Sequence, residues 1–261
     1  MNVDIWSDIA CPWCFIGKRR FEKALSEFPH RDRVSVTWHS YQLDPTLPDH
    51  YDGTELEYLS QRKGMPAERV AQMFDHVTQV AAGEGLAYDF GRVAVANSFS
   101  AHELLHLAKA KDAAGGTDTS RGTDARGGTT ADAVKEALLS AHFEHGEDIG
   151  ARDVLVRIGT EAGLDADEIN AALDAGTYRD SVRADIAQAQ AIGIQGVPFF
   201  VLDNKYGVSG AQPAELFTQA LETAWREAHP LVMVGQPAAG ADGSVDPDGL
   251  NGEVCGPEGC V

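Results

Sequence analysis

The chain has 261 residues, 43% of them hydrophobic and 23% charged, which is the composition of a globular protein with one sizeable core. Its formal net charge of −19 argues against nucleic acid or an anionic membrane surface as a partner, because like charges repel. No apolar stretch approaches the roughly 20 residues that a bilayer-spanning helix needs, and the first residues lack the pattern of a secretory signal. The sequence therefore predicts a cytoplasmic protein.

The chain begins with a strand-like run at residues 3–6, and the sequence Cys11-Pro12-Trp13-Cys14 then leads into a helical pattern. This order places Cys11 at the N-cap of a helix, Pro12 at its first position and Cys14 one turn in. Unpaired N–H groups and the positive end of the helix dipole favour a thiolate there. We therefore expect Cys11 to be the exposed nucleophile of a redox pair and Cys14 to be its resolving thiol. The alternatives are half of a metal site or two unrelated buried thiols.

The middle of the chain changes from strands to helices. Residues 34–38 alternate as a half-buried strand does, so a β-α-β unit is complete by residue 43. Residues 55–191 then show the spacing of several amphipathic helices. Within them, residues 115–130 are rich in Gly, Thr, Asp and Ser without apolar periodicity, which predicts a mobile surface loop.

Strand character returns late in the chain, at residues 197–202 and 205–208. The intervening Asp203-Asn204 suits a tight hairpin turn. A last helix is expected at residues 213–228. The order β-α-β, helices, β-β-α predicts a small mixed sheet that a helical segment interrupts.

Three motifs together resemble the thioredoxin superfamily and, within it, the FrnE-like branch of the DsbA family. They are the run from Asp8 to Lys18 around the two cysteines, residues 97–102 in the helical segment, and residues 193–200. The resemblance implies an α/β, thioredoxin-like fold with a large all-helical insertion between the β-α-β and β-β-α halves. It also implies a DsbA-like protein disulfide oxidoreductase or isomerase, with Pro198 in the cis form facing the dithiol.

On this basis we expect three parts in the chain. Residues 1–47 and 192–229 are expected to form the thioredoxin-like domain, residues 48–191 the helical insertion domain, and residues 230–261 a flexible C-terminal tail.

The resemblance also assigns site residues, with Cys11, Cys14 and Pro198 expected to be catalytic. The substrate groove is expected to include Pro12, Trp13, Val197, Asn97 and His102. Because Trp13 brings no cation to the dithiol, we expect a weaker oxidant than periplasmic DsbA. No bound cofactor is expected, and glutathione or a thioredoxin system is the expected source of electrons.

Charged residues around the motif leave two interpretations open. Asp8 either repels the thiolate or relays a proton, or it is an exposed strand residue. Lys18, Arg19 and Arg20 are expected to form a solvated helix face rather than a binding site.

Histidines in the helical segment raise the alternative of a metal site. His102, Glu103 and His106 match the two-His, one-Glu pattern of zinc peptidases, and His142 and His145 lie three apart. No third ligand stands at a recognised spacing, so we expect no metal.

A second cysteine pair, Cys255 and Cys260, lies near the C-terminus. Its spacing allows a small disulfide-closed ring. We expect either an auxiliary redox pair that exchanges with Cys11 and Cys14, or a disordered tail with two idle thiols.

The leading functional hypothesis is a cytoplasmic thiol–disulfide oxidoreductase that acts on protein or small thiols, in defence against oxidative stress. One alternative is a glutathione-dependent isomerase or transferase resembling 2-hydroxychromene-2-carboxylate isomerase and kappa-class glutathione transferase. Another is a non-catalytic binding module or holdase with an apolar groove around Trp13, Phe199 and Phe200. The sequence does not name the substrate or distinguish a monomer from a homodimer.

Overall fold

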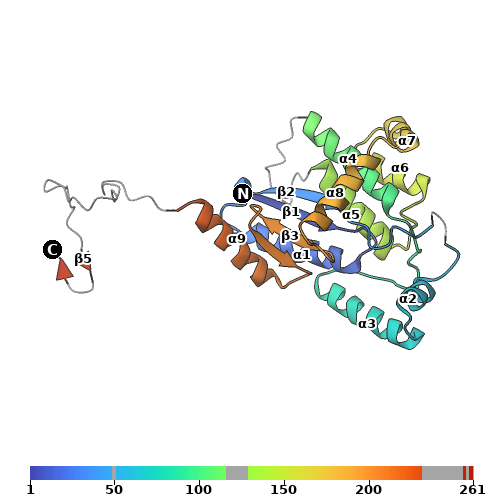
Figure 1. The fold of residues 1–261 in the computed structure, drawn as a ribbon, viewed down its shortest axis with the longest axis horizontal. Coiled ribbons are helices and arrows are strands. Elements are labelled where there is room, and N and C mark those ends of the chain that lie inside the picture. The colour runs from blue at the N-terminus through green and yellow to red at the C-terminus, as the bar shows by residue number, and fades with distance from the viewer. Residues whose placement is uncertain (49–50, 116–128, 231–254, 257–258, 261) are drawn as a thin grey trace. The chain divides into compact units, whose positions relative to one another are not determined.

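A computed structural model describes the chain except for residues 49–50, 116–128, 231–254, 257–258 and 261 (Figure 1). The described residues form two compact units, 1–225 and 226–261. Most of the loop expected at 115–130 and most of the tail expected at 230–261 lie outside the described residues.

A four-stranded mixed sheet lies at the centre of the first unit, with the strand order β2-β1-β3-β4. Strand β1 pairs in parallel with β2, and the β1–β3 and β3–β4 pairs are antiparallel. The β3–β4 turn contains Asp203 and Asn204 with φ of 47° and 54°, a backbone region that these two residue types tolerate well. This arrangement confirms the predicted mixed sheet. The strands are β1 (Asn2–Ser7), β2 (Ser35–Ser40), β3 (Phe199–Leu202) and β4 (Tyr206–Ser209).

Helices connect and flank the sheet. Helix α1 (Pro12–Glu27) and a short 3-10 helix (Arg31–Arg33) join β1 to β2, and α9 (Ala214–Ala228) follows β4. In Figure 1 the insertion forms two groups, with α2 and α3 on one side and α4 to α8 on the other. The insertion contains α2 (Glu55–Lys63), α3 (Ala67–Gly83), α4 (Phe99–Ala114), α5 (Thr130–Phe143), α6 (Arg152–Glu161), α7 (Ala166–Ala175) and α8 (Arg179–Ala191).

Local signals fix both ends of α2. The Thr54 side chain accepts a hydrogen bond from the Glu57 backbone, and the Glu57 carboxylate accepts one from the Thr54 backbone in return. Gly64 ends the helix with φ of 61°, which a residue without a Cβ adopts at little cost.

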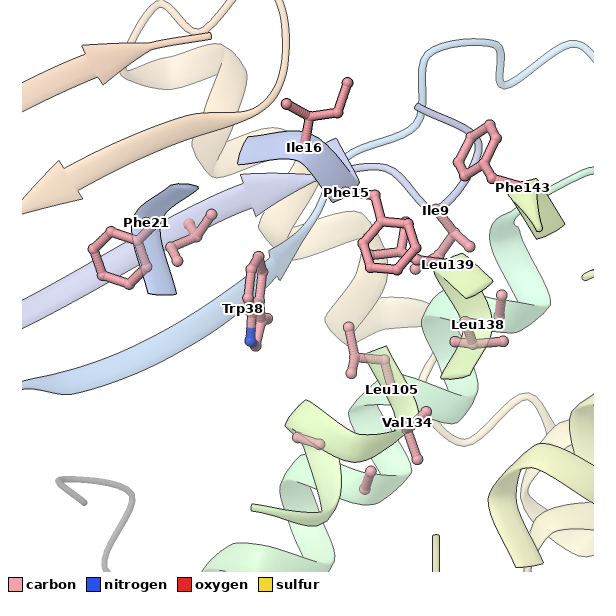
Figure 2. Packing of buried hydrophobic residues seen from close by; sticks show 14 of the residues in the cluster. Ile9, Phe15, Ile16, Phe21, Trp38, Leu105, Val134, Leu138, Leu139 and Phe143 are labelled. Carbon is pink, nitrogen blue, oxygen red and sulfur yellow. The ribbon is translucent and has the colours of Figure 1, made fainter. Parts of the chain in front are cut away.

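One hydrophobic core joins the sheet to the insertion. Phe21 of α1 packs edge-on against Phe217 of α9, with ring centroids 5.7 Å apart, on one part of this core. On another part, Phe15 and Ile9 face α5 (Figure 2). Figure 2 shows the insertion's contribution through Leu105, Val134, Leu138, Leu139 and Phe143. Because these side chains share a single core, residues 1–225 form one compact unit.

The basic residues of α1 attach that helix to the insertion, so the expectation of a solvated face is wrong. Lys18 is only 2% exposed, and a buried ammonium requires carboxylate partners. The ion pairs that cross to the insertion join Lys18 to Asp132 and Glu136, Arg19 to Glu136, and Arg20 to Glu84.

A second polar network attaches α8 and α4 to β2. The Asp185 carboxylate lies 2.9 Å from Nδ1 of His39 and 3.0 Å from Nε2 of His106, and it accepts a hydrogen bond from the Ser40 backbone at 2.8 Å.

None of the helices in the described part of the chain combines the length and apolar character that a membrane crossing requires.

Candidate active site

The two N-terminal cysteines lie where the sequence predicts, at the start of α1. Cys11 is the N-cap residue, with extended φ and ψ of −103° and 112°, and Pro12 occupies the first helical position. The Cys14 backbone N–H donates to the Cys11 carbonyl at 3.0 Å, which closes the first turn. Both residues are free thiols. The positive end of the helix dipole therefore acts on the Cys11 sulfur.

Cys11 is 4% exposed and Cys14 is 1% exposed, so the expectation of an exposed Cys11 is wrong. The chain before β3 covers Cys11, and the Cys11 thiol donates to the Val197 carbonyl at 3.5 Å. Burial and the neighbouring Cys11 raise the pKa of the Cys14 thiol well above its ordinary value. The Cys14 thiol is therefore held in its neutral form.

The segment that covers Cys11 contains a cis peptide bond between Val197 and Pro198, as expected. The Pro198 ring lies close to Gly17 of α1, because a Cβ added at Gly17 would come within 2.8 Å of the Pro198 Cγ. Gly17 is therefore a site residue that the sequence analysis missed. Its lack of a side chain lets Pro198 approach the helix that carries the dithiol.

Tyr88 is another residue that sequence analysis missed. It precedes α4 in the insertion, is 7% exposed, and donates from its hydroxyl to the Pro12 carbonyl at 2.7 Å. Burial and the nearby thiols Cys11 and Cys14 raise the pKa of Tyr88, so its hydroxyl remains a donor. The insertion thereby fixes the backbone between the two cysteines.

Asp8 and His102 form a buried pair behind the dithiol loop. Asp8 is 1% exposed and His102 is fully buried, with Oδ1 and Nε2 3.3 Å apart. The Asp8 carboxylate also accepts hydrogen bonds from the Leu43 backbone at 2.7 Å and from the Ala10 backbone at 3.3 Å. Burial alone would raise the pKa of Asp8, but the His102 and Leu43 hydrogen bonds hold it below its ordinary value. Asp8 is thus a buried carboxylate, not an exposed strand residue.

A cleft of about 870 Å³ opens beside the dithiol, with Cys11, Trp13 and Val197 in its lining. Two apolar side chains in this lining are well exposed, Leu43 at 49% and Met73 at 40%. Helices α2 and α3 of the insertion contribute much of the lining. The apolar part of the lining includes Leu47, Leu59, Phe74, Val77, Phe90 and Val95. The arrangement places a free thiol in the wall of a partly apolar cleft.

Residues 2–222 match the model of the DSBA-like thioredoxin domain. The chain belongs to this family. A probable DsbA oxidoreductase from Streptomyces coelicolor is similar in structure, with a TM-score of 0.78 and 41% identity over 100% of this chain and 98% of that chain. Assignment of this DsbA-like domain to the FrnE-like branch stays a prediction.

Two further solved structures resemble this DsbA-like domain. The cytosolic disulfide reductase DsbM from Pseudomonas aeruginosa has a TM-score of 0.59 and 20% identity, over 87% of this chain and 100% of that chain. A 2-hydroxychromene-2-carboxylate isomerase has a TM-score of 0.60 and 14% identity, over 87% and 98% of the two chains. At these identities both likenesses show the fold alone.

Two predicted groove residues lie elsewhere in this DsbA-like domain. His102 is fully buried behind Asp8 and outside the cleft lining, because its ring is needed to pair a buried carboxylate. Asn97 lines a separate polar hollow of about 450 Å³. There it accepts a hydrogen bond from Gln42 at 2.8 Å and donates to the Leu47 carbonyl at 2.6 Å. The prediction that both line the dithiol groove is corrected, whereas Pro12, Trp13 and Val197 do line it.

The apolar groove expected around Phe199 and Phe200 is also corrected. Phe200 is fully buried against Phe21, with ring centroids 5.4 Å apart, because its side chain points into the main core. Phe199 alternates to the other face of the strand and packs with the cluster around Trp6. Neither side chain reaches the cleft.

The histidine pattern of α4 separates in space. His102 faces Asp8, Glu103 lies 3.6 Å from Arg179, and His106 contacts Asp185. Within the described part of the chain, no three His, Cys, Asp or Glu side chains are grouped as metal ligands.

The C-terminal cysteines belong to the second unit. Strands β5 (Cys255–Gly256) and β6 (Gly259–Cys260) form a hairpin in which Cys255 is opposite Cys260. Their side chains lie outside the described residues, so an auxiliary redox pair stays a prediction.

Proposed function

We propose that this DsbA-like domain is a thiol–disulfide oxidoreductase in which Cys11 attacks the substrate and Cys14 resolves the mixed disulfide. One observation carries the proposal: Cys11 lies at the N-terminus of α1, adjoins Cys14, and lines an open cleft. A dithiol in that position can form a mixed disulfide and then close its own disulfide. Pro198, which the resemblance implies to be catalytic, is proposed to act as a positioning residue, because it follows Val197, whose carbonyl contacts the Cys11 sulfur.

The proposed reaction has two steps. In the first, the Cys11 thiolate attacks one sulfur of a substrate disulfide, and the other substrate sulfur leaves as a thiolate. In the second, Cys14 attacks the Cys11 sulfur and releases the remaining substrate thiol. The substrate disulfide gains two electrons, and the enzyme's dithiol becomes a disulfide that glutathione or a thioredoxin system reduces again.

Trp13 supports this reductive direction. It supplies no positive charge between the cysteines, and its ring lies 6.1 Å from that of His76 on α3. The dithiol is therefore not held strongly in its reduced form, in contrast to strongly oxidising relatives. We place this activity in the cytoplasm, in the repair of oxidised protein or small-molecule thiols. The naming of DsbM as a cytosolic disulfide reductase is in keeping with this placement.

Reduction of insulin, together with the Cys11–Cys14 reduction potential from equilibration with glutathione, tests this proposal. All variants carry Cys255→Ser and Cys260→Ser, so that only the first pair exchanges. We expect the parent to reduce insulin with a potential in the cytosolic range, and Cys11→Ser to lose the activity at least 100-fold. Absence of exchange in the parent, or unchanged activity in Cys11→Ser, would contradict the proposal.

The parent and the Cys11→Ser variant also test the alternative function, that of an isomerase. The shared fold of a 2-hydroxychromene-2-carboxylate isomerase is the observation that keeps this candidate in view. Isomerisation of a chromene carboxylic acid with glutathione, retained in Cys11→Ser, would favour it. We expect no such turnover, because the site holds two adjacent thiols.

A further inference from the structure

A fully buried lysine of the insertion lies on a helix that packs against α1. Lys135 is on α5, which packs against α4 and α1, and its side chain is 0% exposed. Its Nζ atom has no hydrogen-bond partner among the described residues. The nearest described π-system is the ring of Trp38 on β2, with its centroid 5.4 Å from the Lys135 Nζ.

Lys135 stands in the sequence between Asp132 and Glu136, the two α5 carboxylates that pair with Lys18 of α1, so this turn of α5 lies against the helix that carries Cys14. Cys14, Asp8 and Cys11 attract its ammonium, and Lys18 repels it. His102 on α4 is kept neutral in part by the same ammonium. Burial lowers the pKa of Lys135 to about 8, and the attraction of these thiols and of Asp8 opposes that shift.

Packing alone does not account for an amine at this position. Burying an unpaired ammonium costs free energy, and an apolar side chain of the same length would fill the space without that cost. Buried ionisable groups that lower stability are concentrated at functional sites, where a reaction uses their charge. The attraction between Lys135 and Cys14 gives that charge a use, because the Lys135 ammonium opposes the burial that keeps Cys14 protonated.

Building on the proposed function, we propose that Lys135 is a positioning residue of the resolving step, the cation that stabilises the Cys14 thiolate as it attacks the Cys11 sulfur. In this step the Cys14–Cys11 S–S bond forms and the bond between Cys11 and the substrate sulfur breaks. The substrate sulfur leaves with the electron pair and takes up the proton that Cys14 loses. The helical insertion thereby supplies a positive charge for the resolving step.

Release of the coloured thiolate from 5,5′-dithiobis(2-nitrobenzoate) separates the two steps. In the Cys255→Ser and Cys260→Ser background, the first equivalent reports attack by Cys11 and the second reports resolution by Cys14. We expect Lys135→Met to slow the second phase about threefold near neutral pH, because a one-unit rise in a thiol pKa lowers the thiolate population about tenfold but makes the remaining thiolate more nucleophilic. The first phase should slow less, because Cys11 attracts the Lys135 ammonium less than Cys14 does. We expect Lys135→Arg, which keeps the charge, to restore the second phase.

The pH profile and stability distinguish this role from a structural one. The gap between parent and Lys135→Met should narrow as pH rises, because Cys14 then ionises without help, and the urea midpoint of the variant should not fall. The exposed Lys23→Met on α1 is the matched control and should change neither phase. An unchanged second phase in Lys135→Met, or a loss in both phases with a lower urea midpoint, would overturn the inference. Absence of both phases in the parent would instead overturn the proposed function.

Discussion

The Nε2 atom of His102 lies 3.3 Å from Oδ1 of Asp8, and both side chains are buried. His102 belongs to the insertion, and Asp8 belongs to the loop that leads into Cys11. Burial lowers the pKa of His102, and the hydrogen bonds to Asp8 keep that carboxylate ionised. A neutral imidazole therefore donates to a buried anion, which fixes the insertion to the loop before the dithiol.

The Asp8–His102 pair predicts a clear stability effect. His102→Leu leaves the buried Asp8 carboxylate without its His102 partner, so we expect a loss of about 3 kcal/mol in the free energy of unfolding. Adding Asp8→Asn removes the unpaired charge and should recover part of that loss. Urea denaturation of the two single variants and the double variant measures the coupling. Additive effects would show that the contact contributes nothing.

Lys18 provides a second test of how the insertion is attached. Its ammonium is buried with Asp132 and Glu136 of α5, so Lys18→Met leaves two insertion carboxylates without this partner. We expect a loss of about 3 kcal/mol in the free energy of unfolding. Lys23→Met on the exposed side of the same helix is the control, with an expected change below about 0.5 kcal/mol. Equal effects at the two positions would argue against the attachment.

The buried imidazole of His142 predicts acid sensitivity. Burial lowers its pKa to about 4 from an ordinary value of 6.5, so the unfolded chain takes up the proton first as pH falls. Stability should therefore decline between pH 6.5 and 4, by on the order of 3 kcal/mol in all. His142→Phe should flatten this part of the pH profile, and the exposed His145→Phe should not. A profile that stays equally steep in His142→Phe would contradict the assignment.

Substitution of Lys135 should change the free energy of unfolding in the opposite direction to substitution of Lys18. Its pKa falls from 10.5 to about 8 on folding, so the unfolded chain binds the proton more tightly and stability is lost as pH falls through that range. We expect Lys135→Met to be more stable than the parent at pH 7, by on the order of 2 kcal/mol. The gain should shrink as pH rises from 8 towards 10.5. Urea denaturation at three pH values checks this, and a destabilised variant at pH 7 would contradict it.

Local signals made the fold and the dithiol predictable. Strand alternation marked β1 and β2, Asp203-Asn204 marked the hairpin, and Pro12 marked the start of α1 beside Cys11. Each depends on residues within one turn or one strand, which is the range over which backbone preferences act.

The side chains whose surroundings were not predicted correctly depend on contacts between distant parts of the chain. Lys18 resembles any surface lysine until α5 brings Asp132 beside it, 114 positions later in the sequence. The interaction of Lys135 with the dithiol could not be predicted either, because no pattern of residues within α5 indicates it. His102 was noticed as part of a motif, but its direction follows from the docking of α4 rather than from spacing. Such tertiary pairings override the local pattern.

Trapping a mixed disulfide on Cys11 tests the central claim most directly. The variant combines Cys14→Ser with Cys255→Ser and Cys260→Ser, is incubated with glutathione disulfide, and is analysed by intact-mass and peptide mass spectrometry. We predict one glutathione adduct, located on Cys11, whereas the parent with Cys14 present should form the internal disulfide and hold no adduct. The account would be contradicted if Cys11 stayed unmodified in the Cys14→Ser variant and the parent formed no Cys11–Cys14 disulfide.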